Sequence, residues 1–374
     1  QILHSYWDTS IVTMNDAEIN PSRLNKFNAS RSVFNSIFYS LYLINIKKVN
    51  LFVLGHSVYG SRTMMAVARL YSIPILNYAN WNYHFQKQYI DSAWWDIDLE
   101  KLSLIKSKDA NEYFEDRIIG KGKYEDANNA VTKKSSSNTL PKNVIFLHIF
   151  KDSAFNVIDK KRIFKDYFDW ISNTLLIVSE SSELWSLRLH PSASRWGEDQ
   201  ICTINNIIKD IELKNNISLK NVVIENSNQR SNIEILNNAN KIVTFNGTIH
   251  LEALCFGVKP IVISECMMTR YFPNSVFKPT NLNEYKKFLL ENINTIIKEE
   301  NDIIKYKKLI YYRENFISLN NILKSIYTYR GDSEDLNKMA FRDLKEKCET
   351  HKEILSKKFK NLFTDKISKT DSIL

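Results

Sequence analysis

The chain has 374 residues, with 51 Lys or Arg against 42 Asp or Glu and a formal net charge of +9 at pH 7. This length suits two domains of ordinary size, and a hydrophobic content of 44% excludes a chain that is disordered throughout. With 8 Gly and 7 Pro, collagen-like and linker-like chains are excluded as well. The basic excess favours a partner that carries negative charge, such as nucleic acid, anionic lipid or a phosphate-bearing ligand.

Cysteine spacing and hydropathy indicate in which cellular compartment the chain is expected. The four cysteines stand far apart and form no CxxC pair, which favours free thiols in a reducing compartment over a disulfide frame or a zinc site. No apolar run approaches the length of about 18 residues that a membrane span needs. A charged-then-apolar N-terminal signal is also missing. We therefore expect a cytoplasmic location, at most peripheral on the inner face of the cytoplasmic membrane.

Residues 1–140 are predicted to form a first α/β unit. An apolar run at 49–54 is followed by a glycine-containing loop, a helical stretch at 63–71 and a second apolar run at 73–78. Strand, helix and strand at this spacing predict a parallel pair joined by a crossover. The polar residues 121–142 are interpreted as the linker to a second unit.

A second α/β unit is predicted over residues 143–282. Its strands are expected at 144–147, 184–189, 221–224, 241–245 and 260–264, and its helices at 162–176, 201–214 and 247–256. Such alternation predicts a parallel sheet with both faces covered, and ligands of these sheets bind beyond the carboxyl ends of the strands. The fold class is therefore α/β, with two Rossmann-like units that face each other across a cleft.

The remaining residues are predicted to be helical, as a segment at 283–330 and a basic tail at 331–374. Residues 338–369 hold ten Lys or Arg against five Asp or Glu, a net charge of +5, which leaves +4 for the rest of the chain. Ile354, Leu355 and Phe359 recur at roughly helical spacing, as in a basic amphipathic helix on an anionic membrane surface. The alternative is a helix that packs its apolar stripe on the body.

The most informative motif is the sequence Asn246-Gly247-Thr248, between a strand and a short helix. Gly247 allows a sharp turn and close approach of a ligand, and Thr248 is a natural N-cap whose helix end attracts a phosphate. Glu252, one turn further on, would accept hydrogen bonds from ribose hydroxyls. The alternative is an ordinary helix start, with Gly257 as its C-terminal cap and Glu252 solvated.

A second motif, Arg188-Leu-His190-Pro191-Ser192, ends a predicted strand. Alternation places Arg188 and His190 on one face, and the proline stops the strand so that Ser192 can cap the next loop or helix. Arginine, histidine and serine at a strand end suit a diphosphate or a phosphate–sugar bond. A buried histidine bonded to backbone is the alternative.

Three residues are candidates for the catalytic base or nucleophile. Asp152 is the first choice, followed by His56 and His148; His148 and Asp152 come directly after the first strand of the second unit. His56 belongs to the loop after the strand at 49–54. An Asp152 that only caps a following turn is the alternative. The GxGxxG, GxSxG, Walker and HExxH motifs are all missing.

Taken in order, four segments resemble the C-terminal half of bacterial glycosyltransferases that build capsule and other surface polysaccharides. They are Phe146-Leu-His148, 164–170, Arg188 to Ser192 and Asn246 to Gly257, within residues 143–282. The resemblance is to transferases of GT-B architecture, including those that use CMP-activated Kdo or sialic acid. It implies that the donor nucleotide is held by His190, Pro191, Ser192, Gly247, Thr248 and Glu252.

The resemblance predicts transfer of a sugar from a nucleotide-sugar, with a CMP-sugar favoured, to a growing capsule, lipopolysaccharide or other surface glycan. It implies no cofactor and no metal. A nucleotide-sugar epimerase or polyol-phosphate transferase on the same fold is one alternative. A non-catalytic, membrane-associated partner in polysaccharide assembly is another. Nucleic acid is not expected as a partner, because no recognised binding module occurs.

Overall fold

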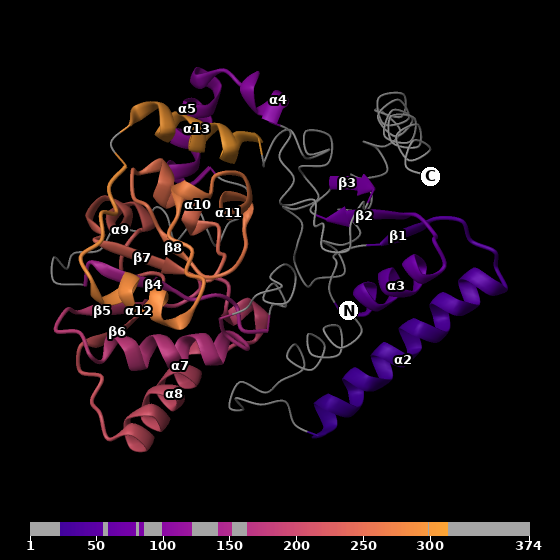
Figure 1. The fold of residues 1–374 in the computed structure, drawn as a ribbon, viewed down its shortest axis with the longest axis horizontal. Coiled ribbons are helices and arrows are strands. Elements are labelled where there is room, and N and C mark those ends of the chain that lie inside the picture. The colour runs from indigo at the N-terminus through magenta and orange to yellow at the C-terminus, as the bar shows by residue number, and fades with distance from the viewer. Residues whose placement is uncertain are drawn as a thin grey trace, which may run out of the picture.

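The computed structural model describes residues 23–54, 59–79, 82–85, 99–121, 141–151, 163–297 and 299–312. These residues form two α/β bodies, one around a three-stranded sheet and one around a five-stranded sheet (Figure 1). His56, Asp152 and the tail at 331–374 lie outside the described residues. The predicted α/β class is confirmed, whereas a cleft between the two units stays a prediction.

The first sheet has the order β1-β2-β3. Strands β1 and β2 are parallel, as predicted, and β3 pairs with β2 in the antiparallel sense. Ile44, Phe52 and Met65 share a core that joins the first helix to the strands and to the helix between them. The elements are α2 (Arg23–Asn45), β1 (Phe52–Leu54), α3 (Tyr59–Leu70), β2 (Ile75–Ala79) and β3 (Asn82–Phe85).

The second sheet is entirely parallel and has the order β6-β5-β4-β7-β8. The chain starts at the centre with β4, proceeds to one edge and then returns to build the other side, so the strand order reverses between β4 and β7. The strands are β4 (Asn143–Phe146), β5 (Trp185–Arg188), β6 (Val222–Glu225), β7 (Lys241–Thr244) and β8 (Ile261–Val262).

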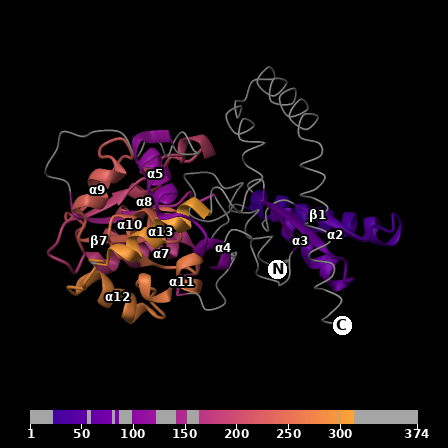
Figure 2. The ribbon, with the colours of Figure 1, turned by 90° about the horizontal axis from the view of Figure 1, so that it is seen from above.

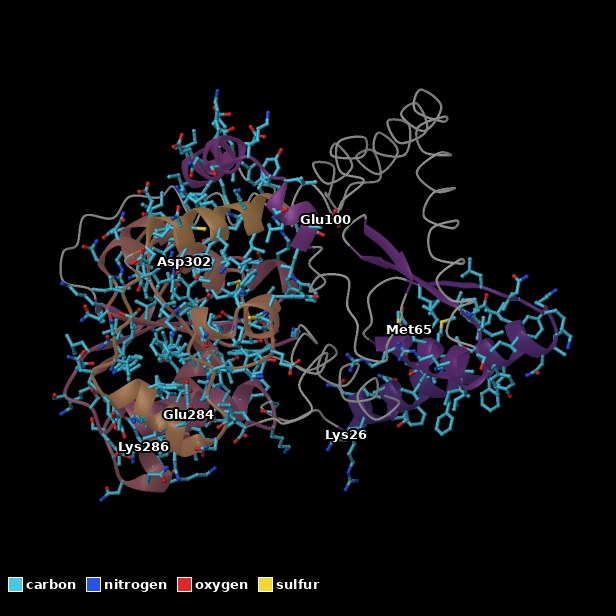
Figure 3. All side chains as sticks on the ribbon, turned by 45° about the horizontal axis from the view of Figure 1, so that its top comes forward. Lys26, Met65, Glu100, Glu284, Lys286 and Asp302 are labelled. Carbon is cyan, nitrogen blue, oxygen red and sulfur yellow. The ribbon has the colours of Figure 1, made fainter. Side chains whose placement is uncertain are left out.

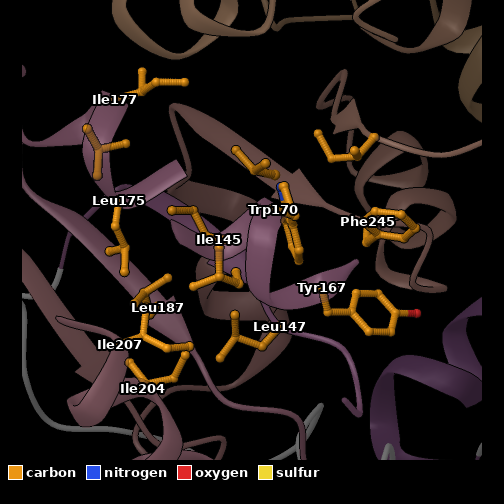
Figure 4. Close-up of a cluster of buried hydrophobic side chains, with 14 of the residues drawn as sticks. Ile145, Leu147, Tyr167, Trp170, Leu175, Ile177, Leu187, Ile204, Ile207 and Phe245 are labelled. Carbon is orange, nitrogen blue, oxygen red and sulfur yellow. The ribbon is translucent and has the colours of Figure 1, made fainter. Parts of the chain in front are cut away.

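Helices cover both faces of this sheet, because alternate residues of its central strand enter different cores. Ile145 packs in a core with Trp170 and Phe245 (Figure 4), while Val144 and Phe146 join a smaller core on the other side. The helices are α7 (Tyr167–Val178), α8 (Gln200–Asn215), α9 (Asn232–Asn238), α10 (Ile249–Cys255), α11 (Met267–Tyr271), α12 (Leu282–Leu290) and α13 (Glu300–Tyr311).

Side-chain caps fix where several of these helices begin. Asp166 accepts a hydrogen bond from the backbone N–H of Asp169, so α7 starts at Tyr167 rather than at the predicted 162. In the same way, Asp199 caps α8. The predicted helical segment at 283–330 contains α12 and α13, and the described residues between them, 291–297 and 299, are not helical.

Residues 99–121 pack on the second sheet's body, although the sequence division assigned them to the first unit. They form α4 (Leu99–Ser103), α5 (Ser107–Asp116) and a short π-helical turn, η1 (Arg117–Lys121). Figures 1 and 2 both show α5 beside α13, which in turn contacts α10. Phe114 of α5 is buried in one core with Leu254 and Leu309, and this apolar contact ties the segment to the second body.

Candidate functional site

Three of the predicted site residues follow the ends of β4, β5 and β7. Because the three strands are parallel neighbours, their carboxyl ends share one edge of the sheet. His148 follows β4, His190 follows β5 and Asn246 follows β7. The strand order reverses between β4 and β7, and ligands of such sheets bind at that point.

Two histidines from different loops lie side by side at this edge. The ring centroids of His148 and His190 are 5.9 Å apart, and the His148 ring stacks on Tyr167 at 5.2 Å with an interplanar angle of 9°. His148 and His190 were both predicted from their strand ends. Tyr167 was not, since nothing in the sequence distinguishes it from a core aromatic residue.

Backbone contacts give the two imidazoles opposite tautomers when they are neutral. The backbone N–H of Ser192 donates to Nδ1 of His190 at 3.1 Å, so the proton of that ring is carried by Nε2. Nδ1 of His148 lies 3.2 Å from the carbonyl oxygen of Ile149 and donates to it, which leaves a lone pair on Nε2. His190 therefore presents a hydrogen-bond donor and His148 an acceptor.

The His190 ring is held in its neutral form. Burial, together with the charge of nearby His148, lowers the pKa of His190 from 6.5 to about 3. Part of the residue is still accessible to solvent. A neutral donor at this position is thus present throughout the physiological pH range.

A polar network beneath the two histidines was not anticipated from the sequence. The side-chain amide of Gln200 donates to the carbonyl oxygen of His148 at 2.8 Å, and its Oε1 accepts from the backbone N–H of His190 at 2.9 Å. Glu198 accepts from that same amide and from the backbone N–H of Lys151. Burial raises the pKa of the Glu198 carboxyl. Gln200 thereby fixes the loops after β4 and β5 relative to each other.

The turn after β7 differs from the expected capped helix. Thr248 occupies the N-cap position, but its side chain makes no capping hydrogen bond and is exposed, so the predicted side-chain cap is wrong. The N–H of Gly247 instead donates to Oγ1 of Thr244 at 3.2 Å. Nδ1 of His250 donates to the Gly247 carbonyl at 2.6 Å, because the short helix turns this ring back onto the turn.

Gly247 does not adopt a left-handed conformation, whereas Gly257 after α10 does, with φ at 75°. A Cβ at Gly247 would lie 3.1 Å from Oγ1 of Thr244, so the missing side chain lets that hydroxyl approach the turn. Gly257 ends α10, as the alternative interpretation of the motif expected.

Two buried oxygen atoms near this turn lack a hydrogen-bond partner in the described part of the chain. They are Oδ1 of Asn246 and Oγ of Ser264. The backbone N–H of Ser264 donates to the carbonyl oxygen of Phe245 at 2.9 Å, which brings the end of β8 beside the turn. Buried polar groups are nearly always paired, so these two oxygens leave hydrogen-bonding capacity unused beside the turn.

Glu252 and Arg188, both predicted to contact the donor, form buried ion pairs. Oε1 of Glu252 accepts from Nη2 of Arg117 at 2.7 Å. Nη1 of Arg188 donates to Glu225 at 2.7 Å, and its Nη2 donates to the backbone carbonyl of Arg230, also at 2.7 Å. Burial lowers the pKa of Arg188. These contacts engage the Arg188 guanidinium within the protein and join β5 to β6.

Pro191 and Ser192, both half-buried, complete the loop after β5. Ser192 donates its backbone N–H to His190, and its hydroxyl makes no hydrogen bond within the described residues. Across those same residues, no three His, Cys, Asp or Glu side chains cluster so as to hold a metal ion. No described helix is both long and apolar enough to cross a membrane.

No family model and no curated protein matches the chain. Among solved structures, KpsC of Thermosulfurimonas dismutans, a β-Kdo 2,4 transferase, is similar at 10% identity and a TM-score of 0.39, over 68% of this chain and 78% of that one. UDP-GlcNAc 2-epimerase of Methanocaldococcus jannaschii, in complex with UDP-GlcNAc and UDP, is similar at 11% identity and 0.33, over 78% and 82%. S. aureus MnaA with UDP is similar at 12% and 0.31, over 88% and 94%.

Proposed function

We propose that the chain is a glycosyltransferase that moves a sugar from a nucleotide-sugar, in first place a CMP-sugar, to a growing capsule, lipopolysaccharide or other surface glycan. The observation that carries this proposal is the pairing of His148 with His190 at the reversal point of the parallel sheet. Phosphate-bearing nucleotides are the ligands that such an edge commonly binds. The resemblance of the strand-end motifs to surface-polysaccharide transferases supports a sugar as the group that is transferred.

His190 is assigned to the leaving phosphate. Its Nε2–H is a donor on a neutral ring, held in place through Ser192 and Gln200. Negative charge grows on the leaving phosphate during sugar transfer, and a preorganised donor stabilises that charge more strongly in the transition state than in the ground state. Pro191 fixes the loop, and Asn246, Gly247 and Thr248 line the nucleotide side of the same edge.

The catalytic base is assigned first to Asp152, with His148 and His56 behind it. Of these, His148 is the one whose surroundings support the role, since its Nδ1 donates to the Ile149 carbonyl and its Nε2 is left to accept a proton. Glu252 keeps a place in donor binding, because a carboxylate has about four acceptor positions, of which Arg117 uses one and the Asn232 amide, at 3.4 Å, a second. The reaction proposed needs no cofactor, and the basic tail at 331–374 would hold the enzyme at an anionic membrane surface.

The test is a thermal-shift panel with CMP, CDP, UDP and GDP. A nucleotide at about 100 times its Kd stabilises the native state by about 2.7 kcal/mol, which is several degrees in Tm. We expect one nucleotide to raise the Tm of the wild-type chain and of the surface control Asn206→Ala. The same nucleotide should leave the Tm of His190→Ala and of Asn246→Ala unchanged. Stabilisation by no nucleotide would overturn the proposal in favour of a non-catalytic role.

Turnover then separates the enzyme classes. A glycosyltransferase consumes the matching nucleotide-sugar in proportion to added acceptor glycan, while an epimerase converts it without an acceptor. We expect acceptor-dependent turnover that is lost in His190→Ala. Comparison of Asp152→Asn, His148→Gln and His56→Gln, each checked for nucleotide binding, identifies the base as the variant that binds and does not turn over.

A further inference from the structure

Helix α2 exposes an apolar face that none of the described residues covers. Large apolar side chains that are 44–68% exposed follow one side of this 23-residue helix. Their spacing is three or four positions, except between Phe27 and Phe34, where Arg31 occupies the intermediate position. They are Leu24, Phe27, Phe34, Phe38, Tyr42 and, just beyond the helix, Ile46. We call this set the α2 stripe. Isolated exposed apolar residues are ordinary, but several large apolar side chains gathered on one side of a helix indicate an interaction surface.

The stripe lies on the side of α2 opposite to its buried face. At 100° per residue, the buried residues Ala29, Val33 and Ile44 fall together on one side of the helix, and Phe34 and Phe38 fall on the other. The buried side packs against α3 and the first sheet, and Figure 1 shows α2 at the outer edge of that body. The core of the first body is therefore complete without the stripe.

Residues 19–90, which contain α2 and the first sheet, are also strongly basic. Between residues 19 and 90 the sequence holds eight Lys or Arg and no Asp or Glu. Arg23, Lys26 and Arg31 belong to α2, and Lys47 and Lys48 follow its end; Figure 3 labels Lys26 near the start of the helix. The basic excess of the chain is thus not confined to the tail.

A polar hollow of about 450 Å³ borders the stripe. Asn28, Ser32, Asn35 and Tyr39 line it together with Arg31, the cation that α2 contributes to it. In the described part of the chain, no carboxylate pairs with Arg31. A guanidinium among amide and hydroxyl groups is suited to a phosphate group.

We propose that α2 docks the protein on an anionic lipid surface, with the α2 stripe in the interfacial layer and the headgroup phosphate of a lipid at Arg31. Aromatic side chains on one face with cations at both ends are the pattern of helices that lie in the membrane interface. A second copy of the chain fits less well, because two α2 helices would bring six cations together with no carboxylate on either helix. This inference does not depend on the proposed activity.

Cosedimentation with lipid vesicles tests the proposal on the full chain. The probes are vesicles of phosphatidylcholine alone and vesicles with equal parts of phosphatidylcholine and phosphatidylglycerol. We expect binding to the anionic vesicles that weakens as salt is raised. The double variant Phe34→Gln/Phe38→Gln should lose at least about tenfold in partition coefficient, and Arg31→Gln about fivefold.

Matched controls separate this surface from general effects. Leu104→Gln/Leu213→Gln removes two apolar side chains elsewhere that are at least as exposed as Phe34 and Phe38, and Lys209→Gln removes an exposed cation from α8. Both controls should stay within twofold of wild type. Circular dichroism and sedimentation velocity without lipid check folding and self-association for every variant.

Three results would overturn the proposal. The first is no binding of the wild-type chain to anionic vesicles. The second is unchanged binding in the α2 variants together with a loss in the tail variant Lys357→Gln/Lys358→Gln/Lys360→Gln, which would assign the surface to the tail alone. The third is an α2 variant that alters self-association and leaves vesicle binding intact, which would make the stripe a contact between copies.

Discussion

The guanidinium of Arg117 donates to the carboxylate of Glu252 at 2.7 Å, although the two residues are 135 positions apart in the chain. Both side chains are about 90% buried. The pair joins η1, which precedes the predicted linker, to α10, which follows the turn of the candidate site. Removal of either partner from an ion pair at this depth destabilises the fold, because the remaining charge would be buried without a partner.

Replacement of Arg117 by Met is therefore expected to lower the free energy of unfolding by about 3 kcal/mol. The double variant Arg117→Met/Glu252→Leu should recover part of that loss, since it leaves no unpaired charge. Urea denaturation of the single and double variants measures both. Equal stability of Arg117→Met and wild type would contradict the buried pair. Nucleotide binding by the double variant then shows whether Glu252 also contacts the donor.

A pH dependence arises from His190. Its pKa is about 3 in the folded chain against about 6.5 when unfolded, so between these values the unfolded chain binds a proton that the folded chain does not. The free energy of unfolding therefore has its full value above pH 6.5 and declines as the pH falls toward 3, because protonation of His190 favours the unfolded chain. The accessible part of the ring limits the effect, and we expect about 1 kcal/mol between pH 6.5 and 5.

The measurement is urea denaturation of wild type and His190→Asn at pH 7.5, 6.5 and 5. Asn retains an oxygen that can accept the Ser192 N–H and has no proton to gain. The variant should be less stable than wild type at pH 7.5 and should show the smaller decline toward pH 5. Parallel declines in the two proteins would show that His190 is protonated in the folded chain.

The pair of Arg188 and Glu225 gives a third prediction. Burial alone would raise the pKa of Glu225, but hydrogen bonds from Arg230 and Ser186 hold it below its usual value. Glu225→Gln should cost about 3 to 5 kcal/mol of unfolding free energy. The surface pair of Lys214 and Asp210, with 71% and 47% of the side chains exposed, is the control, and Lys214→Met should change stability by less than about 0.5 kcal/mol.

Gly257 supplies a fourth prediction. Its φ is 75°, and a Cβ there would lie 3.2 Å from the carbonyl oxygen of Ile297. Gly257→Ala should lower the unfolding free energy by about 1 to 2 kcal/mol, mainly from the left-handed backbone. Gly257→Asn, which tolerates that conformation better, should cost less if backbone strain dominates. A larger loss for Asn would indicate that the contact with Ile297 dominates.

The sequence predicts the second sheet well because its strands are short apolar runs bounded by polar residues, as at β4 and β7. It does not predict α2, because apolar residues such as Val33 and Phe34 occupy both sides of that helix and remove the one-faced periodicity. Helix α7 starts several residues later than the sequence predicts, because the Asp166 side chain accepts a hydrogen bond from the Asp169 N–H and caps the helix there.

The candidate site was predictable only where a strand end marks it. His148 and His190 directly follow β4 and β5, so their proximity results from parallel pairing. In the sequence, Glu198 and Gln200 do not differ from ordinary polar residues at the start of a helix. Their hydrogen bonds form only because the loops after β4 and β5 come together in the fold. Likewise, no local pattern indicates that Glu252 pairs with a residue from η1, since the contact is made only by tertiary packing.

The packing of α5 on α10 and α13 bears on how the chain can be cut. Residues 99–121 carry Phe114 into the core of Leu254 and Leu309, so this segment belongs to the folding unit of the second sheet. An expression fragment that starts at residue 141 would leave that core open to water, whereas one that starts at residue 99 would keep it closed. A chain cleaved by a protease between residues 122 and 140 would accordingly give two pieces that still migrate together under native conditions.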